Sequence, residues 1–223
     1  MFSQTPSLEP SDTGATSVGS AEPSVATVTP ALDSAALDLL FREARSTQTF
    51  LATPVASETL RELYQLVKWT PTGFNSQPAR FRFVQSPEAK ERLAPALSSS
   101  NRDKVLAAPV TVIVAHDTRF YDRLPQLFPA YDARPLFENT PDFAESTARH
   151  NATLQAAFLI LAARALGLDA GPMSGFKPEE VERRFFADGR HRVTLLVNLG
   201  YGDQSRVRSR GVRLDFEDVA QIL

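Results

Sequence analysis

Residues Ala152–Leu166 read ATLQAAFLILAARAL, a run that is apolar on almost every side of a helix and is followed by Gly167. A glycine directly after a helical run is typical of a helix C-terminus. Since a helix that is apolar nearly all round is buried, the run predicts a long central helix. Two other apolar runs rich in β-branched residues, Val110–Ala115 and Val193–Leu199, predict inner strands of a sheet covered on both faces.

The flanking sequence predicts further helices and one more strand. Apolar residues recur at helical spacing from Leu37, with an end near Arg45, and again from Leu60 to Val67. The residues Phe81 and Phe83 alternate with arginines and predict a strand. The pair Ser86-Pro87 is a typical helix start, and residues 178–186 also read as a helix, while the segments 167–175 and 214–223 are left without a regular element. Helices and strands are mixed without strict alternation, which predicts a layered α+β domain.

Composition excludes several classes of function. The 223 residues carry a net charge of −2, are 43% hydrophobic and contain no cysteine. Disulfides, thiolate nucleophiles and cysteine-ligated metals are therefore excluded. The near-neutral charge argues against nucleic acid as a partner, and no apolar run is long enough to span a membrane. We expect a small-molecule substrate.

The first 34 residues differ from the rest of the chain. They contain four prolines, four acids and no Lys, Arg or His. Such a segment cannot bury enough apolar area to offset the entropy of ordering it, so we predict a disordered tail at residues 1–34 and one domain at residues 35–223. No secretory or mitochondrial signal is recognisable, which predicts a cytoplasmic location.

Familiar catalytic motifs do not fit. The turn Gly200-Tyr201-Gly202 follows a predicted strand, but too little chain remains for a dinucleotide-binding unit, and no P-loop occurs. Ser174 is misplaced for a nucleophile elbow, and the three histidines lack metal-ligand spacing. We therefore expect no metal site and no catalytic acid, base or nucleophile.

Three polar segments remain as candidate binding loops. Residues 71–81 place Asn75 and Gln77 between two prolines, which restrict the loop and can aim the amides. Residues 171–176 contain Gly175, which would let backbone N–H groups approach a ligand. Four arginines within residues 206–213, with Arg45 and Ser46, suit a phosphate monoester. Each segment also has a simpler interpretation. Residues 71–81 could be an ordinary connecting loop, residues 171–176 a plain turn, and the arginines a solvated charged surface.

At these residues the sequence resembles the nitroreductase-type FMN-dependent oxidoreductases, and within them the RutE-like branch that contains malonic semialdehyde reductases. The stretches LAARALGLD at 161–169 and GPMSGF at 171–176 resemble that branch most specifically. The resemblance runs from about Leu37 to Phe216. It implies a three-layer α/β/α sandwich with a mostly antiparallel central sheet, and a homodimer with FMN at each subunit junction.

The resemblance also implies cofactor contacts at particular positions. Arg45 and Ser46 match the flavin-contacting segment after the first helix, and Asn75 matches an amide near the ribityl chain and ring. Ser174 and Gly175 match the loop beside flavin N5. The phosphate positions are Arg210 and Arg213, with Arg208 as an alternative to either, and Gln48, where many relatives carry a basic residue. Ala79 replaces a frequent aromatic residue of the wider family.

The implied reaction is ping-pong hydride transfer from NADH or NADPH through flavin N5 to an acceptor. The branch suggests a small carbonyl acid such as malonic semialdehyde, reduced to 3-hydroxypropanoate, with Arg80 or Arg134 as candidate carboxylate partners. A broad nitroaromatic or quinone reductase is the alternative within the same class. The alternative from a different functional class is a flavin-binding or interaction protein without turnover.

Overall fold

The computed structural model describes residues 29–223, so most of the tail predicted at residues 1–34 lies outside the described residues. The chain divides into two units between Leu32 and Asp33, and the folded unit starts at Asp33. Its centre is a four-stranded sheet in which every neighbouring pair is antiparallel, in the order β1-β2-β4-β3. The strands are β1 (Ala79–Val84), β2 (Val110–Asp117), β3 (Asp169–Met173) and β4 (His191–Gly200).

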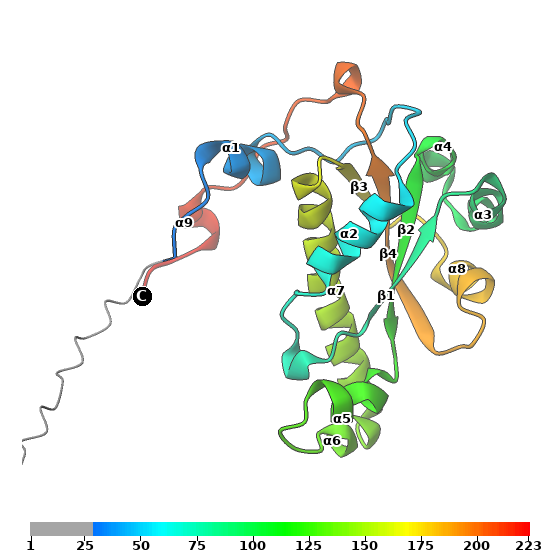
Figure 1. Ribbon diagram of the computed structural model, residues 1–223, viewed down its shortest axis with the longest axis vertical. Coiled ribbons are helices and arrows are strands. Elements are labelled where there is room, and N and C mark those ends of the chain that lie inside the picture. The colour runs from blue at the N-terminus through cyan, green and yellow to red at the C-terminus, as the bar shows by residue number, and fades with distance from the viewer. Residues whose placement is uncertain (1–28) are drawn as a thin grey trace, which may run out of the picture. The chain divides into compact units, whose positions relative to one another are not determined.

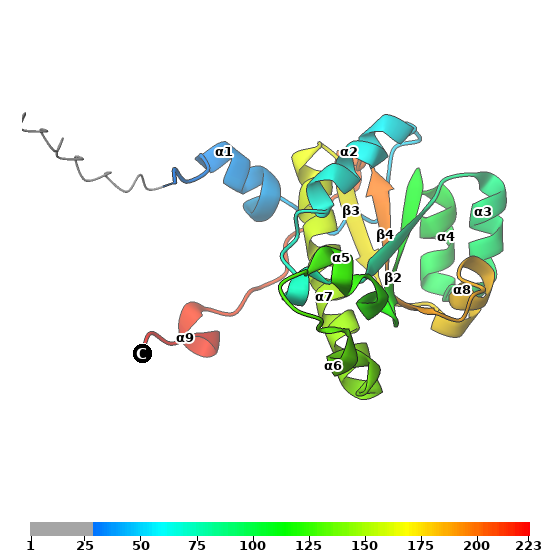
Figure 2. The same cartoon turned by 60° about the horizontal axis from the view of Figure 1, so that its bottom comes forward.

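Helices cover both faces of this sheet, as Figures 1 and 2 show. One face carries α2 (Ser57–Val67) and α7 (Pro141–Ala165), and the other carries α3 (Pro87–Leu93), α4 (Ser99–Ala107) and α8 (Pro178–Phe185). Alternate residues of β2 point to the two sides: Val112 packs in the α2–α7 core and Ile113 in the opposite core. This is the predicted three-layer α+β sandwich.

A third apolar cluster is formed partly by the residues that follow the C-terminal end of β2. It joins Phe120 and Phe137 to Ala148 of α7, and Phe74 packs against it. The short elements here are η4 (Phe120–Arg123), α5 (Leu124–Leu127) and α6 (Arg134–Glu138). The remaining short elements are α1 (Ser34–Leu37), η1 (Asp38–Arg42), η2 (Gly73–Asn75), η3 (Ala94–Ala96), η5 (Gln204–Arg206) and α9 (Phe216–Val219).

Several predicted elements are confirmed, together with the residues that were expected to start or end them. The side chain of Ser86 accepts a hydrogen bond from the Ala89 N–H at the start of α3, and Pro87 is the first helical residue. Gly167 ends α7 with a φ of 74°, a left-handed conformation that glycine adopts without strain. β2 and β4, both predicted as inner strands, occupy the two central positions of the sheet.

Three predictions need correction. The long helix starts at Pro141 rather than Ala152, and it is not buried all round, because Leu154 is 49% exposed. The first helix ends at Arg42, and its second half, Asp38–Arg42, is a π-helix. Residues Asp169–Met173, read as part of a loop, form edge strand β3. Pro172 is tolerated there because an edge strand pairs on one side only.

Candidate functional site

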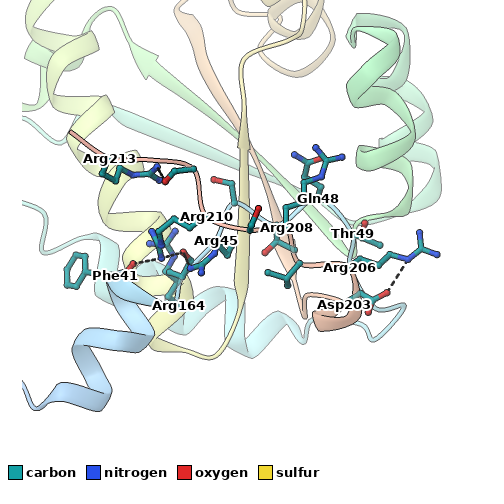
Figure 3. Close-up of a pocket in the computed structure, with 16 residues that line it drawn as sticks. Phe41, Arg45, Gln48, Thr49, Arg164, Asp203, Arg206, Arg208, Arg210 and Arg213 are labelled. Carbon is teal, nitrogen blue, oxygen red and sulfur yellow. Dashed lines mark hydrogen bonds and ion pairs between the residues drawn. The ribbon is translucent and has the colours of Figure 1, made fainter. Parts of the chain in front are cut away.

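A cavity of about 600 Å³ lies between the segment after the first helix and the segment after β4 (Figure 3). Its lining contains six arginines and a single acid, Asp203. The arginines are Arg45, Arg164, Arg206, Arg208, Arg210 and Arg213. Such an excess of guanidinium groups favours an anionic ligand, and phosphate in particular, because the planar fork of arginine matches its oxygens.

Backbone pairing with β3 and with the end of β4 fixes one wall of this cavity. Ser46 forms a parallel bridge with Ala170, and the Thr47 N–H donates to the Ala170 carbonyl at 3.0 Å. Further along, Phe50 pairs with Gly202, and the Asp203 N–H donates to the Thr49 carbonyl at 3.0 Å. The wall is therefore an extended segment attached to the sheet edge.

Gly171 permits the close approach of this segment. A Cβ atom at position 171 would lie 2.2 Å from the carbonyl oxygen of Thr47. No side chain fits at that distance, so the wall residues Ser46–Gln48 depend on a glycine in β3.

The arginines of the opposite wall are anchored on the end of the first helix. Arg45 Nη1 donates to the Glu43 carbonyl at 2.8 Å, and Arg210 Nη2 donates to the Ala44 carbonyl at 3.0 Å and also contacts the Arg42 carbonyl. Arg164 of α7 donates to the Leu40 carbonyl at 2.9 Å. These contacts place three guanidinium groups together, because unpaired carbonyls at a helix end attract cations.

Two observations favour the binding of an anionic ligand by these arginines. The Nε of Arg45 is buried and has no partner within the described residues. Burial lowers the pKa of Arg164, an effect opposed by Asp169, and the nearby Arg210 lowers it further. An anion in the cavity would accept a hydrogen bond from the unpaired donor and would reduce the repulsion between the cations.

The loop predicted to present amides is strained and firmly held. Phe74, Asn75 and Gln77 have φ values of 57°, 48° and 43°, and they are the only non-glycine residues with positive φ in residues 29–223. Backbone strain of this kind clusters at functional sites. Asn75 Nδ2 donates to the Leu127 carbonyl at 3.0 Å, and Gln77 Nε2 donates to Asn75 Oδ1 at 2.9 Å.

Helix α7 holds both ends of this loop through buried amides. Asn151 Oδ1 accepts from the Gly73 N–H at 2.8 Å, and Gln155 Oε1 accepts from the Ala79 N–H at 2.9 Å. Neither amide was singled out in the sequence, where Gln155 is an ordinary polar residue of the predicted apolar helix and Asn151 lies just before the predicted start of that helix. Their spacing of four on one helix face is a signal that could have found them.

The Asn151 contact gives a first testable result. Asn151→Ala leaves the Gly73 N–H without its acceptor, so we expect the free energy of unfolding to fall by about 1–3 kcal/mol. Urea unfolding of Asn151→Ala and of Thr153→Ala, an exposed neighbour on α7, would measure the difference. Equal midpoints for the two variants would contradict the anchoring role.

The Ser174–Gly175 turn follows β3 directly. The Gly175 carbonyl accepts from the Ser98 N–H at 3.0 Å and from Asn101 Nδ2 at 3.2 Å, so the start of α4 fixes the turn. The N–H of Gly175 donates to no backbone acceptor within residues 29–223.

The structure therefore brings most of the predicted site together, but not all of it. Five predicted positions line the cavity: Arg45, Ser46, Gln48, Arg210 and Arg213. Asn75, Ser174 and Gly175 are not among its lining residues. Arg164 also lines the cavity and was not predicted as a site residue, although it lies in the stretch 161–169 that carries the family resemblance.

Comparisons with known proteins agree on one family. The model of the nitroreductase family matches residues 41–201. The chain is similar to the Bacillus subtilis protein ydfN, described as a nitroreductase, with 27% identity, a TM-score of 0.78, and coverage of 85% of this chain and 99% of that one.

Two more distant solved structures share the fold. A protein from Exiguobacterium sibiricum, described as a nitroreductase in complex with FMN, is 20% identical with a TM-score of 0.75, over 88% of this chain and 100% of that one. A protein from Staphylococcus epidermidis, described as an NAD(P)H:FMN oxidoreductase, is 23% identical with a TM-score of 0.75, over 88% of this chain and 98% of that one.

Proposed function

Because this chain belongs to the nitroreductase family, we propose that it is an FMN-dependent NAD(P)H oxidoreductase. The observation that carries the proposal is the arginine-lined cavity, whose Arg45 and Arg210 are anchored together beside the glycine-dependent wall at Ser46–Gln48. Relatives of the same fold support it, one determined with FMN and one described as an NAD(P)H:FMN oxidoreductase.

The residues of the cavity fit a flavin phosphate. Arg45, Arg164 and Arg210 offer guanidinium donors on one side, and the buried, unpartnered Nε of Arg45 is a ready donor. Ser46 and Gln48 supply neutral donors on the other side. Gln48 contributes no charge, so the dianionic phosphate depends on the arginines of the opposite wall.

Catalysis would then rest on the cofactor together with backbone groups of this chain. Bound FMN supplies hydride acceptance from NADH or NADPH at N5 and hydride donation to an acceptor. We assign the Gly175 N–H, which donates to no backbone acceptor within residues 29–223, as the donor toward N5, with Ser98 and Asn101 holding the carbonyl of the same residue. Asn75 is assigned to the ribityl chain and ring, and no side chain is assigned as a general acid or base.

A homodimer accounts for the residues that one chain leaves apart. Asn75 does not line the arginine cavity, and we propose that a second copy brings such an amide to the same cofactor. Large apolar side chains are exposed on α7, as at Phe143, and along the C-terminal segment, as at Val212 and Ile222. Figures 1 and 2 both draw α1 and α9 outside the three layers. Such exposed apolar surface is typical of an interface.

For the acceptor, we retain a small carbonyl acid such as malonic semialdehyde, on the resemblance to the RutE-like branch. Arg80 is not a candidate for its carboxylate, since Arg80 Nη2 pairs with Asp117 at 2.7 Å. Arg134, which faces Glu138 at 4.0 Å, stays a candidate.

No helix within residues 29–223 is long and apolar enough to cross a membrane, and the cytoplasmic location stays a prediction.

Spectroscopy of the purified full-length chain tests the proposal. We expect flavin absorbance that NADH or NADPH bleaches anaerobically and that an acceptor restores. A panel of semialdehydes, quinones and nitro compounds, compared by kcat/KM, then ranks the acceptors. A colourless protein that does not take up added FMN would overturn the proposal, whereas bound flavin without bleaching would indicate a binding protein. Light scattering measures the dimer.

Arg210→Ala tests the phosphate contact. Losing a charge-assisted hydrogen bond should weaken FMN binding about tenfold or more, because such a bond contributes about 1.5–3 kcal/mol. Quenching of flavin fluorescence on titration of the apoprotein measures the affinity. Arg61→Ala on α2, exposed and outside the cavity, is the matched control. Unchanged affinity in Arg210→Ala would remove Arg210 from the phosphate site.

A further inference from the structure

A second cavity, of about 440 Å³, lies along the edge strand β1 and is also lined by residues of α2, α5 and α7. It shares no lining residue with the arginine cavity. Its apolar lining includes Tyr64, Phe81, Phe83 and Leu127, and no acid lines it. The second cavity is therefore a separate place for a ligand, with its own chemistry.

Two basic side chains give the second cavity a positive charge that no acid of its lining balances. Lys68 follows α2 and Arg123 precedes α5, and neither forms an ion pair within residues 29–223. Burial lowers the pKa of Arg80, Asp117 opposes this effect, and repulsion from Arg123 lowers it further. Arg80 itself is occupied, since its Nη2 pairs with Asp117 at 2.7 Å. The cavity therefore favours an anion near Lys68 and Arg123.

A nearly buried amide adds a hydrogen-bond donor to the second cavity. Gln155 of α7 lines it, although only 4% of this residue is exposed. Gln155 Oε1 accepts from the Ala79 N–H at 2.9 Å, which leaves Nε2 as a donor without an acceptor in the part of the chain that the structure describes. Nε2 is not fully enclosed, so it stays accessible from the cavity. A ligand oxygen that accepts from Nε2 would remove the cost of leaving this donor unpaired.

The outer edge of β1 supplies backbone donors beside Gln155. The Pro78 carbonyl accepts from the Asp117 N–H of β2 at 3.0 Å. Hydrogen-bonded and non-hydrogen-bonded pairs alternate along an antiparallel ladder, so Phe81 and Phe83 turn their N–H groups away from β2. The Ala79 N–H, on the same side, is the one that Gln155 accepts. The edge therefore adds donors to a cavity that already lacks acids.

We infer that the second cavity binds a small carboxylic acid with an aromatic or other apolar body. Lys68, Arg123 and the Gln155 amide bind the carboxylate, and Tyr64 and Leu127 contact the body. A volume of this size is within the range of about 300–1,000 Å³ that is usual for small-molecule sites, and such sites combine apolar walls with a few polar groups. The inference goes beyond the proposed function, because it involves no residue of the arginine cavity.

Titration of the full-length chain with 3-phenylpropionate tests the inference, and 3-phenylpropanamide is the matched probe with the same body and no charge. We expect saturable binding of the acid and at least about tenfold weaker binding of the amide. Added salt should weaken the binding of the acid only. Calorimetry measures both affinities. Trp69, the single tryptophan, reports on the site by fluorescence, because Lys68 Nζ lies 5.4 Å from its ring centroid.

Two variants locate the carboxylate. Arg123→Gln should weaken binding of 3-phenylpropionate about fivefold, the factor expected for an exposed cation, and leave binding of the amide unchanged. Arg102→Gln on α4, exposed and outside both cavities, is the matched control for a lost surface charge. Gln155→Glu keeps an oxygen for the Ala79 N–H but replaces the donor with a second oxygen, so binding of the acid should weaken at least about tenfold.

The outcomes are distinct. Equal binding of the acid and the amide would overturn the inference, and so would binding of the acid that Arg123→Gln leaves unchanged. Displacement of 3-phenylpropionate by FMN would place the probe in the arginine cavity and overturn it as well. If Gln155→Glu does not fold, as thermal unfolding would show, Arg123→Gln decides alone. A chain that binds no FMN would overturn the proposed function and leave this titration unaffected.

Discussion

Asp117→Ala is expected to lower the free energy of unfolding by up to about 3 kcal/mol, because it leaves two partly buried guanidinium groups without their carboxylate. The Asp117 side chain is 2% exposed and is shared between two arginines. Arg190 reaches it through Nε at 2.5 Å and Nη2 at 2.9 Å, and Arg80 through Nη2 at 2.7 Å. This cluster joins β1, β2 and the turn before β4, so its loss should loosen one end of the sheet.

The same cluster predicts how stability depends on pH. Burial acts to raise the pKa of Asp117, but the hydrogen bonds from Arg190 and from the Arg119 N–H, with the charge of Arg80, outweigh it and hold the pKa below its usual value. A carboxylate with a depressed pKa stabilises the fold above its unfolded pKa of about 3.9, and this contribution is lost as the pH falls through the folded value. Asp117→Asn should therefore differ most from the unaltered protein at neutral pH, and the difference should shrink as the pH falls from about 3.9 toward the lower folded pKa.

Chemical denaturation at a series of pH values measures both effects. Asp103→Ala, an exposed acid on α4, serves as the control and should change stability by less than about 0.5 kcal/mol. A difference between the unaltered protein and Asp117→Asn that stays constant down to pH 2 would contradict the assignment.

Gly171→Ala is expected to damage the cavity without removing a single polar group. The new methyl group would lie 2.2 Å from the Thr47 carbonyl oxygen, so the wall must move by roughly 1 Å before the contact becomes an ordinary van der Waals one. Overpacking of this kind costs about 1–3 kcal/mol of stability. Since Ser46 and Gln48 flank Thr47, we expect FMN binding to weaken at least about tenfold.

Gly211→Ala provides the matched control in the same cavity. A Cβ atom at position 211 meets only Arg213 Nη1, at 3.6 Å, which is an ordinary contact. Fluorescence titration with FMN and thermal unfolding of both variants measure the two effects. If Gly171→Ala and Gly211→Ala bound FMN equally well, the wall at Ser46–Gln48 would not be part of the cofactor site.

The candidate site was predictable where its residues are adjacent in sequence or chemically unusual. Arg45 with Ser46, and the cluster around Arg210, contain side chains that suit phosphate, and the fold brings them together at one cavity. Arg164 was not predicted because the surroundings of its side chain depend on what α7 packs against, and its neighbours in the chain do not reveal them. The amides Asn151 and Gln155 escaped for the same reason, since their partners are 78 and 76 residues away.

The sequence alone determined the layers of this protein. Runs such as Val110–Ala115 are apolar on both sides and must be covered twice, and helix caps such as Ser86 act within one turn, so both are local consequences of residue type. Only the tertiary structure decided that Gly171 and Pro172 belong to an edge strand. Their residue types favour a turn, and the strand exists because pairing with β4 and the approach of Thr47 override that local preference.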